Sequence, residues 1–189
     1  MKHLIWSFCL LWCSRSVQGQ VLGLGAYQPG ITTPDSLNKG VFHELQPPVV
    51  KGTIALVCPH IRLFKADVAG IDGLPVTNLL LLFYDNKLMQ IDCDSNDAVQ
   101  QAFRRKYGSG ILQPQKSIAL CAGQADKPML IQQEIWTNGD VTARIIRTEG
   151  FTADCRKETT QGIVIVNRRI VSLVSECDLP DRYPFFERH

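Results

Sequence analysis

The chain has 189 residues, of which 45% are hydrophobic and 20% charged, and its formal net charge is +2. Removal of Lys2 and Arg15 with an N-terminal leader leaves 18 basic residues, equal in number to the 18 acidic ones. This balance argues against a nucleic-acid-binding protein and against electrostatic attraction to an anionic membrane. The remaining length of about 170 residues is enough for one domain with its own core.

The first 19 residues have the pattern of a cleavable secretory signal peptide. A weakly basic start at Lys2 precedes an apolar run over residues 4–12, and small or permissive residues follow before the expected cleavage point. The mature chain is predicted to start at Gln20 without a transmembrane anchor, because the apolar run is too short to span a bilayer. A lipoprotein processed at Cys13 is the less favoured alternative, since Trp12 stands where a small residue is expected. The predicted location is the periplasm or the extracellular space.

Five of the seven cysteines lie beyond the leader, which predicts two disulfides and one spare thiol in an oxidising compartment. The preferred pairing is Cys93–Cys121 with Cys155–Cys177, and Cys58 is the spare residue. The sequence alone leaves the connectivity open. Neither a CxxC motif nor a Cys/His cluster of zinc spacing is present, so no metal site is predicted.

The predicted organisation is a signal peptide (1–19), a Gly/Pro-rich arm (20–52), a single domain (53–178) and a C-terminal tail (179–189). The many Gly and Pro residues of the arm argue against long regular elements there. Whether the arm lies extended on the domain or is partly disordered is left open. Residues 53–58 and 61–68 read as strands that are interrupted by Pro59.

The stretch over residues 79–110 carries the clearest local signals. Residues 79–83 form an apolar run and residues 89–93 alternate between apolar and polar, which predicts two strands joined by a tight turn at Asp85-Asn86. A helix is then predicted with Asp94 or Ser95 as its N-cap, Asp97 in its first turn and Gly108 after its end. Its apolar residues recur at helical spacing, so one stripe should pack on the hairpin.

Two further hairpins are predicted downstream. Asn138-Gly139, a strong hairpin signal, separates strand-like residues 130–136 and 141–148. Asn167-Arg168 separates residues 163–166 from residues 170–177 in a similar way. The sequence therefore predicts an α+β fold, with an antiparallel sheet of about six or seven strands and one main helix packed on one face.

The paired strands over residues 82–92, the helix ending in Arg105-Lys106-Tyr107-Gly108 and the strand carrying Trp136 together resemble small exported bacterial proteins of unassigned function. This resemblance covers residues 79–175 and implies an envelope location without implying a reaction. A short helix is predicted over residues 34–39, because Pro34 suits the first helical position and Gly40 follows. This helix and the preceding segment Gly30-Ile31-Thr32-Thr33 resemble the β-lactamase-inhibitor-protein fold of outer-membrane assembly lipoproteins.

Cys58-Pro59-His60 resembles the start of the CPHC motif of periplasmic disulfide oxidases. In that motif, a helix N-terminus and the histidine lower the pKa of the thiol, and a second cysteine resolves the mixed disulfide. Ile61 stands in place of the second cysteine, and the surrounding residues read as strand. No catalytic residues and no cofactor are therefore predicted, and a thiol-based redox enzyme using Cys58 and His60 is kept as the alternative.

The preferred function is a non-catalytic exported binding module, for example an inhibitor, an assembly factor or a protective partner. Its expected partner is another envelope or secreted protein, and its oligomeric state is left open. The basic helix end and the tight turn are exposed features on a rigid support, so they form the predicted binding surface. The predicted binding residues are Arg104, Arg105, Lys106, Tyr107, Asp85 and Asn86.

Overall fold

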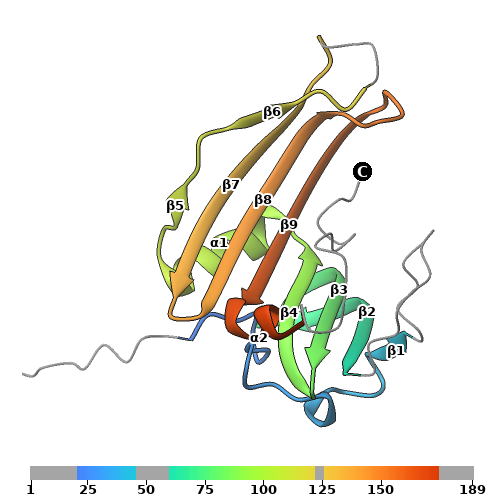
Figure 1. The fold of residues 1–189 in the computed structure, drawn as a ribbon, viewed down its shortest axis with the longest axis vertical. Coiled ribbons are helices and arrows are strands. Elements are labelled where there is room, and N and C mark those ends of the chain that lie inside the picture. The colour runs from blue at the N-terminus through green and yellow to red at the C-terminus, as the bar shows by residue number, and fades with distance from the viewer. Residues whose placement is uncertain (1–20, 46–59, 122–125, 175–189) are drawn as a thin grey trace, which may run out of the picture.

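A computed structural model describes residues 21–45, 60–121 and 126–174. Nine strands form one antiparallel sheet in the order β1-β2-β3-β4-β9-β8-β7, and β5 and β6 both pair with the outer side of β7 (Figure 1). The strands are β1 (His43–Leu45), β2 (Ile61–Ile71), β3 (Leu74–Tyr84), β4 (Lys87–Asp94), β5 (Ile111–Leu112), β6 (Lys116–Ile118), β7 (Met129–Asn138), β8 (Val141–Phe151) and β9 (Lys157–Asn167). The helices are the short 3₁₀ helix η1 (Pro34–Ser36), α1 (Asp97–Tyr107) and α2 (Arg168–Val174).

The predicted α+β class with six or seven strands is wrong. Over the residues that the structure describes, the chain is mostly antiparallel sheet with one substantial helix, α1, and is closer to an all-β fold. Three of the nine strands, β1, β5 and β6, are only two or three residues long and lie at the sheet edges. Such short edge strands carry too few residues for a period-2 pattern to reveal them.

The hairpin predicted around Asn167-Arg168 is also absent from the sheet. The chain leaves the sheet after β9 and enters α2, where the side chain of Asn167 accepts a hydrogen bond from the backbone N–H of Ile170 (3.1 Å). Because β8 and β4 already pair with the two sides of β9, no strand position remains beside it. Tertiary pairing therefore overrides the strand-like pattern of residues 170–174.

The hairpin and the helix predicted within residues 79–110 are confirmed. β3 and β4 are joined by Asp85-Asn86, both of which have positive φ (46° and 59°) as a tight hairpin turn requires. α1 begins one or two residues later than expected, because Asn96 is the N-cap and its side chain accepts a hydrogen bond from the N–H of Val99. Val99 and Phe103 face the main core, as the apolar stripe predicted.

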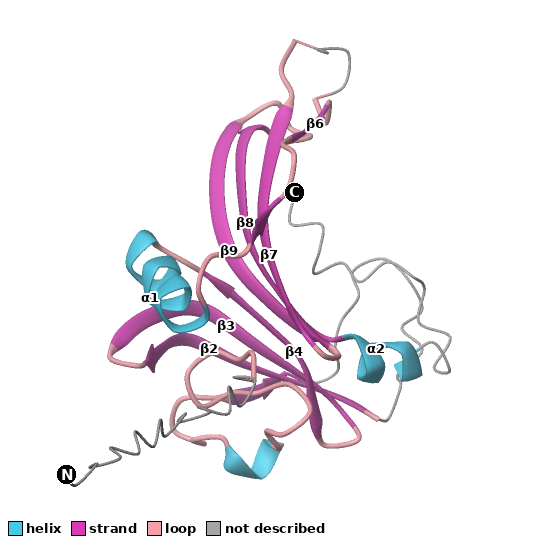
Figure 2. Cartoon of the chain, turned by 90° about the vertical axis from the view of Figure 1, so that its left-hand side faces the viewer, coloured by secondary structure: helices cyan, strands magenta, loops and turns pink. Residues whose placement is uncertain are grey.

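The two helices lie on opposite faces of the sheet (Figure 2). On the α1 face, the main core joins Phe103 and Trp136 to the central residues Ile91 and Ile163. On the other face, a smaller cluster joins Ile170 of α2 to residues of β2, β3 and β4, namely Leu63, Leu80, Leu82 and Met89. Alternate residues of β2, β3 and β4 therefore belong to two different cores, and the face of a residue in these strands follows from its register.

The N-terminal segment over residues 21–45 packs on the α1 face of the sheet and adds β1 to its edge. Leu22, Leu24, Leu37 and Phe42 are buried members of the main core. The ring of Phe42 packs edge-on against Tyr27, with the ring centroids 5.6 Å apart. This segment therefore closes the core despite its Gly/Pro-rich sequence.

The single described disulfide joins Cys121 to Cys155, so both predicted pairings are wrong. Cys93 is buried in the middle of the sheet opposite Ile163, whereas Cys155 lies beyond the end of β8. On β8, Ile145 lies opposite Ile163, the residue that pairs with Cys93, whereas Gly150 lies at the end of the sheet next to Cys121. Ile145 and Gly150 are about 17 Å apart along the strand. That separation far exceeds the span of a disulfide. Cys58 and Cys177 lie outside the described residues.

Candidate functional site

Two of the residues predicted for binding at the end of α1 form hydrogen bonds within the protein. The Nε of Arg104 donates a hydrogen bond to the Oε2 of Glu134 on β7 (2.8 Å). The hydroxyl of Tyr107 accepts from the N–H of Gly23 (3.1 Å) and donates to the carbonyl of Gly23 (3.0 Å). Arg104 therefore fixes α1 to the sheet, and Tyr107 fixes the N-terminal segment to α1.

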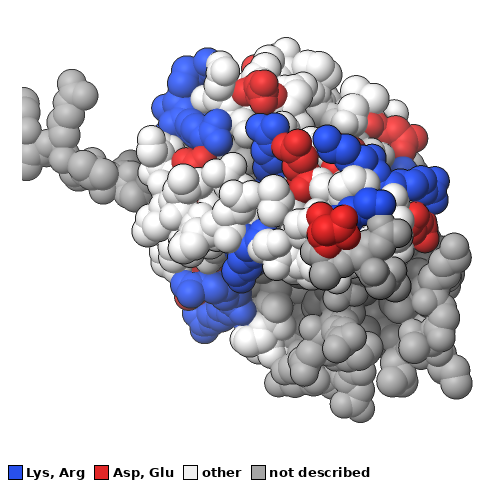
Figure 3. Space-filling view, turned by 90° about the horizontal axis from the view of Figure 1, so that it is seen from above, with Lys and Arg blue, Asp and Glu red and all other residues white. Residues whose placement is uncertain are grey.

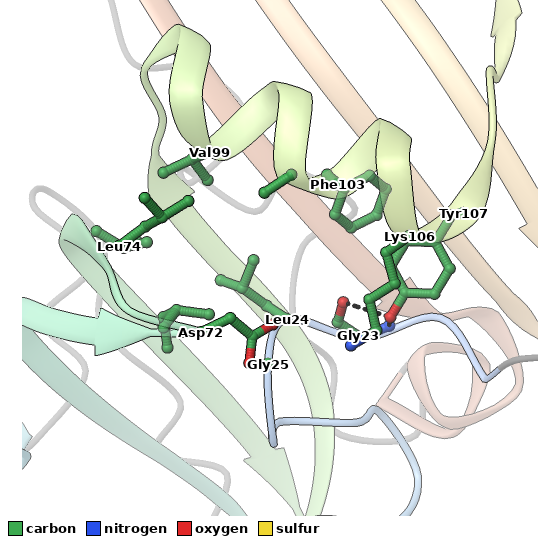
Figure 4. A pocket seen from close by; sticks show the side chains of 12 residues that line it. Gly23, Leu24, Gly25, Asp72, Leu74, Val99, Phe103, Lys106 and Tyr107 are labelled. Carbon is green, nitrogen blue, oxygen red and sulfur yellow. Dashed lines mark hydrogen bonds between the residues drawn. The ribbon is translucent and has the colours of Figure 1, made fainter.

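The contact of Tyr107 with Gly23 closes one side of a small crevice under α1 (Figure 4). The side chains of Val99 and Phe103 point from the helix toward Leu74 and Leu24 across this crevice. Its volume is about 40 Å³, room for only one or two water molecules. The crevice is a packing imperfection of the core and is too small for a metabolite.

Arg105 and Lys106 are exposed, as the predicted surface requires. The Nζ of Lys106 lies 5.4 Å from the ring centroid of Tyr107, within the range of a cation–π contact. These two cations therefore remain accessible on the helix end.

The turn at Asp85-Asn86 belongs to a different polar cluster. The Nδ1 of His60 lies 2.6 Å from the Oδ1 of Asp85, and Arg62 donates a hydrogen bond to the side chain of Asn86 (3.3 Å). Arg62 also forms a two-pronged ion pair with Glu44 on β1. The contacts of this turn and those of the α1 end share no residue, so the structure does not gather the six predicted residues into one site.

The ion pair of Arg62 and Glu44 perturbs both groups. The hydrogen bond from Arg62 lowers the pKa of Glu44, and the same hydrogen bond raises the pKa of Arg62. The pair joins the three-residue strand β1 to β2, so the charge of Glu44 helps to hold one edge of the sheet.

Of the alternative site, Cys58 with His60, the structure describes only His60, because Cys58 lies outside the described residues. His60 is exposed, its ring is bonded to Asp85, and its centroid is 5.8 Å from that of Tyr84. This arrangement orients the imidazole at the surface of the hairpin, and the thiol interpretation stays untested.

The opposite edge of the sheet carries a feature that the sequence interpretation missed. Four large apolar side chains are exposed along β5, β6 and the adjoining strand β7: Ile111 (72%), Leu112 (62%), Ile118 (42%) and Leu130 (37%). We call these four residues the apolar edge. Pro114 interrupts the strand pattern of this segment, so the sequence does not reveal the pairing of β5 and β6 on the two sides of it.

Side chains of β7 hold the start of this edge in place. The Oε1 of Glu134 accepts a hydrogen bond from the N–H of Gly110 (2.9 Å), and the Nε1 of Trp136 donates to the carbonyl of Gly108 (2.9 Å). A Cβ on Gly110 would lie 2.8 Å from the Trp136 ring, so only glycine allows this close approach. Ile111 and Leu112 are thus presented from a rigid support.

A surface groove of about 480 Å³ lies between the end of α1 and the apolar edge. Its wall carries the rings of Tyr107 and Trp136, and Lys106 and Ile111 stand at its rim. Grooves of a few hundred Å³ with aromatic walls are typical recognition sites. The exposed part of the predicted helix end therefore lies beside the missed apolar edge.

Among residues 21–45, 60–121 and 126–174, no group of three or more His, Cys, Asp or Glu side chains is arranged to hold a metal ion. No helix within those residues is long and apolar enough to cross a membrane. Figure 3 shows the end of the molecule that is uppermost in Figure 1, and basic and acidic side chains are interspersed there. That end therefore presents no extended surface of one charge.

The chain matches no family model, no curated protein and no solved structure.

Proposed function

We propose that the protein is a non-catalytic exported binding module, and that another envelope or secreted protein docks on its apolar edge. The observation that carries this proposal is the gathering of four exposed large apolar side chains on one edge of the sheet. The register places Ile111 and Ile118 on the face opposite α1, and Leu112 and Leu130 on the α1 face, so the edge offers apolar side chains on both of its sides. Exposed apolar side chains gathered in this way mark an interaction site. The pairing of β5 and β6 with β7 spreads these residues over about 20 Å of strand, a length suited to a protein partner.

The polar groups beside the edge support binding in preference to chemistry. Glu134 is bonded to both Arg104 and Gly110, and the indole N–H of Trp136 is bonded to a backbone carbonyl. These groups position the edge and are not arranged around a reacting atom. The edge therefore offers apolar contact area, with the cations Arg105 and Lys106 at its side.

Export is supported by the Cys121–Cys155 disulfide, because disulfides form and persist in oxidising compartments. The predicted signal peptide lies outside the described residues, and its cleavage before Gln20 remains part of the proposal. The finer assignment, periplasm or extracellular space, rests on the same two features.

The proposal is tested by capture of the partner from the compartment in which the protein is found. Ile111→Glu places a charge on the apolar edge and should abolish capture, because a carboxylate would be desolvated in the interface. Val68→Glu is the matched control, since Val68 is also exposed (59%) on a strand but lies on β2, near the other edge. Captured proteins are identified by mass spectrometry.

The expected result is one protein retained by the wild type and by Val68→Glu and lost with Ile111→Glu. Equal retention by all three proteins would contradict docking on the apolar edge. Near-identical near-UV circular dichroism of the variants checks that Ile111→Glu leaves the fold intact.

A further inference from the structure

A second groove opens on the face of the sheet opposite α1. It has a volume of about 360 Å³ and is bounded by residues 113–116 and by Ile131, Gln133, Ile135 and Arg144. Trp136 and Glu134 contact α1 and its following loop, so the alternate residues Ile131, Gln133 and Ile135 face the other side. The edge-strand residues that bound the groove lie between Ile111 and Ile118 of the apolar edge along the chain.

A bulge in the edge strand forms the wall of this groove. Leu112 pairs with Glu134 and Lys116 pairs with Ile131, so three residues of the edge oppose only two of β7. The extra residue bends the edge strand away from the sheet, and bulges of this kind are frequent beside functional sites. Pro114 within the bulge also removes a backbone donor, which disfavours the addition of another strand to this edge.

The lining has one sign of charge. Lys116 and Arg144 are its only charged residues, and both are exposed. No acidic side chain of the described part of the chain lies within ion-pair distance of either one, whereas Arg104 and Arg147 do have carboxylate partners. The floor between the two cations is apolar, with Ile131 and Ile135, and Gln133 adds an amide.

The register gives the spacing of the two cations. Lys116 on β6 is opposite Ile131, and Arg144 on β8 is opposite Ile135, so the two cations lie on either side of β7, about 14 Å apart along it and about 10 Å apart across it. An extended peptide advances about 3.3 Å per residue, so carboxylates four positions apart match the spacing along β7, and the long side chains of Lys116 and Arg144 span the distance across it. A guanidinium can bind a carboxylate through two parallel hydrogen bonds, which gives the Arg144 end the stronger anchor.

We propose that this groove binds an extended segment of the protein partner that carries two acidic residues four positions apart with apolar residues between them. One carboxylate binds Arg144, the other binds Lys116, and an apolar side chain lies on Ile131 and Ile135. The inference rests on the proposed function, because it names the chemistry of the segment that reaches past the apolar edge.

The probe is a fluorescent synthetic peptide, Glu-Val-Thr-Val-Glu, with Gln-Val-Thr-Val-Gln as its control, titrated against the purified protein by anisotropy. The acidic peptide should bind saturably and lose affinity as salt is added, because the contacts are exposed ion pairs. Arg144→Gln should weaken binding by at least about fivefold, the scale of a lost charge-assisted hydrogen bond. Lys116→Gln should weaken binding by about two- to threefold, as expected for a more exposed, single contact.

Lys39→Gln is the matched control, since Lys39 is an exposed cation on the N-terminal segment and does not line the groove, and it should leave peptide affinity unchanged. Equal affinity for the acidic and amide peptides, or binding that survives Arg144→Gln, would overturn the inference. Tighter binding of laurate at the same site would assign the groove to a fatty acid, and a dimer that Arg144→Glu dissociates would assign it to a second copy. Either result overturns the peptide assignment. Capture that depends on Ile111 would still support the proposed function in those cases.

Discussion

At the residue scale, Tyr107 acts as a clamp on the N-terminal segment. Tyr107→Phe keeps the ring that packs against Phe103 and removes the hydroxyl that bonds Gly23 on both its N–H and its carbonyl. We expect a loss of about 1–2 kcal/mol in the free energy of unfolding, because a partly buried donor and acceptor lose their partner. Urea denaturation measures this loss.

Tyr27→Phe is the control for this prediction. The ring of Tyr27 also packs on the core, and burial raises the pKa of its hydroxyl, but no hydrogen bond of that hydroxyl occurs within the described residues. An equal loss of stability in the two variants would show that the clamp contributes nothing of its own.

The ion pair of Glu44 with Arg62 should make part of the stability depend on pH. The pKa of Glu44 is lowered in the folded state, so its contribution is present above the ordinary pKa of 4.5 and is lost as pH falls through the folded pKa. At pH 7 the wild type should be more stable than Glu44→Gln by up to about 1 kcal/mol, the range of a partly exposed pair. The difference should shrink below about pH 4.5.

Urea unfolding of the wild type and Glu44→Gln at pH 7 and at about pH 3 tests this dependence. A constant difference between the two proteins across that range would contradict a role for the carboxylate charge. The amide of the variant retains the shape of the side chain, so packing is matched.

At the element scale, the disulfide ties the ends of the β7–β8 hairpin together. Cys121 precedes β7, Cys155 follows β8, and the bond closes a separation of 34 residues. Replacement of both cysteines by serine should lower the free energy of unfolding by about 3–4 kcal/mol on the chain-entropy model. It should also speed amide exchange over residues 116–118, which form a short edge strand next to Cys121.

Peptide mapping without reduction checks the bond itself. A peptide pair linking Cys121 to Cys155 is expected. A pair linking Cys93 to Cys121 would contradict the structure, because Cys93 lies in the centre of the sheet.

The elements that the sequence predicted well are those whose signals are local. Asp85-Asn86 makes a turn that its own backbone preferences favour, and the chain turns at Gly139-Asp140, within the predicted Asn-Gly hairpin signal. The α1 stripe has a period that identifies it. The chain also turns at Asp72-Gly73, between β2 and β3, and both residues have positive φ. The Asp-Gly pair is a turn signal of the same kind, so it could have shown that β2 and β3 extend to this turn. The short edge strands β1, β5 and β6 form because each pairs with a longer strand that is distant in the sequence. The residues of the short strands themselves therefore carry no signal that predicts them.

At the scale of the whole molecule, the candidate site was predictable only in part. Arg105 and Lys106 are exposed as expected, whereas Arg104 and Tyr107 are bonded within the protein. Asp85 contacts His60 on the β3–β4 hairpin and has no contact with the α1 end. The apolar edge could not be recognised from composition, because apolar residues in a sequence are expected inside a core.

The same sheet thus presents two different edges. At one edge, β1 is held by Glu44 and Arg62, a charged pair that discourages further strand pairing. At the other, the Pro114 bulge limits strand pairing while the apolar side chains remain exposed. The asymmetry favours recognition by side chains on the β5–β6 edge.

Hydrogen–deuterium exchange of the protein with and without its captured partner tests the docking edge most directly. We expect slower exchange over residues 110–118 in the complex, with no change at Asp85-Asn86 or over β1. Protection confined to the Asp85-Asn86 turn or to β1, with residues 110–118 unchanged, would contradict docking on the apolar edge.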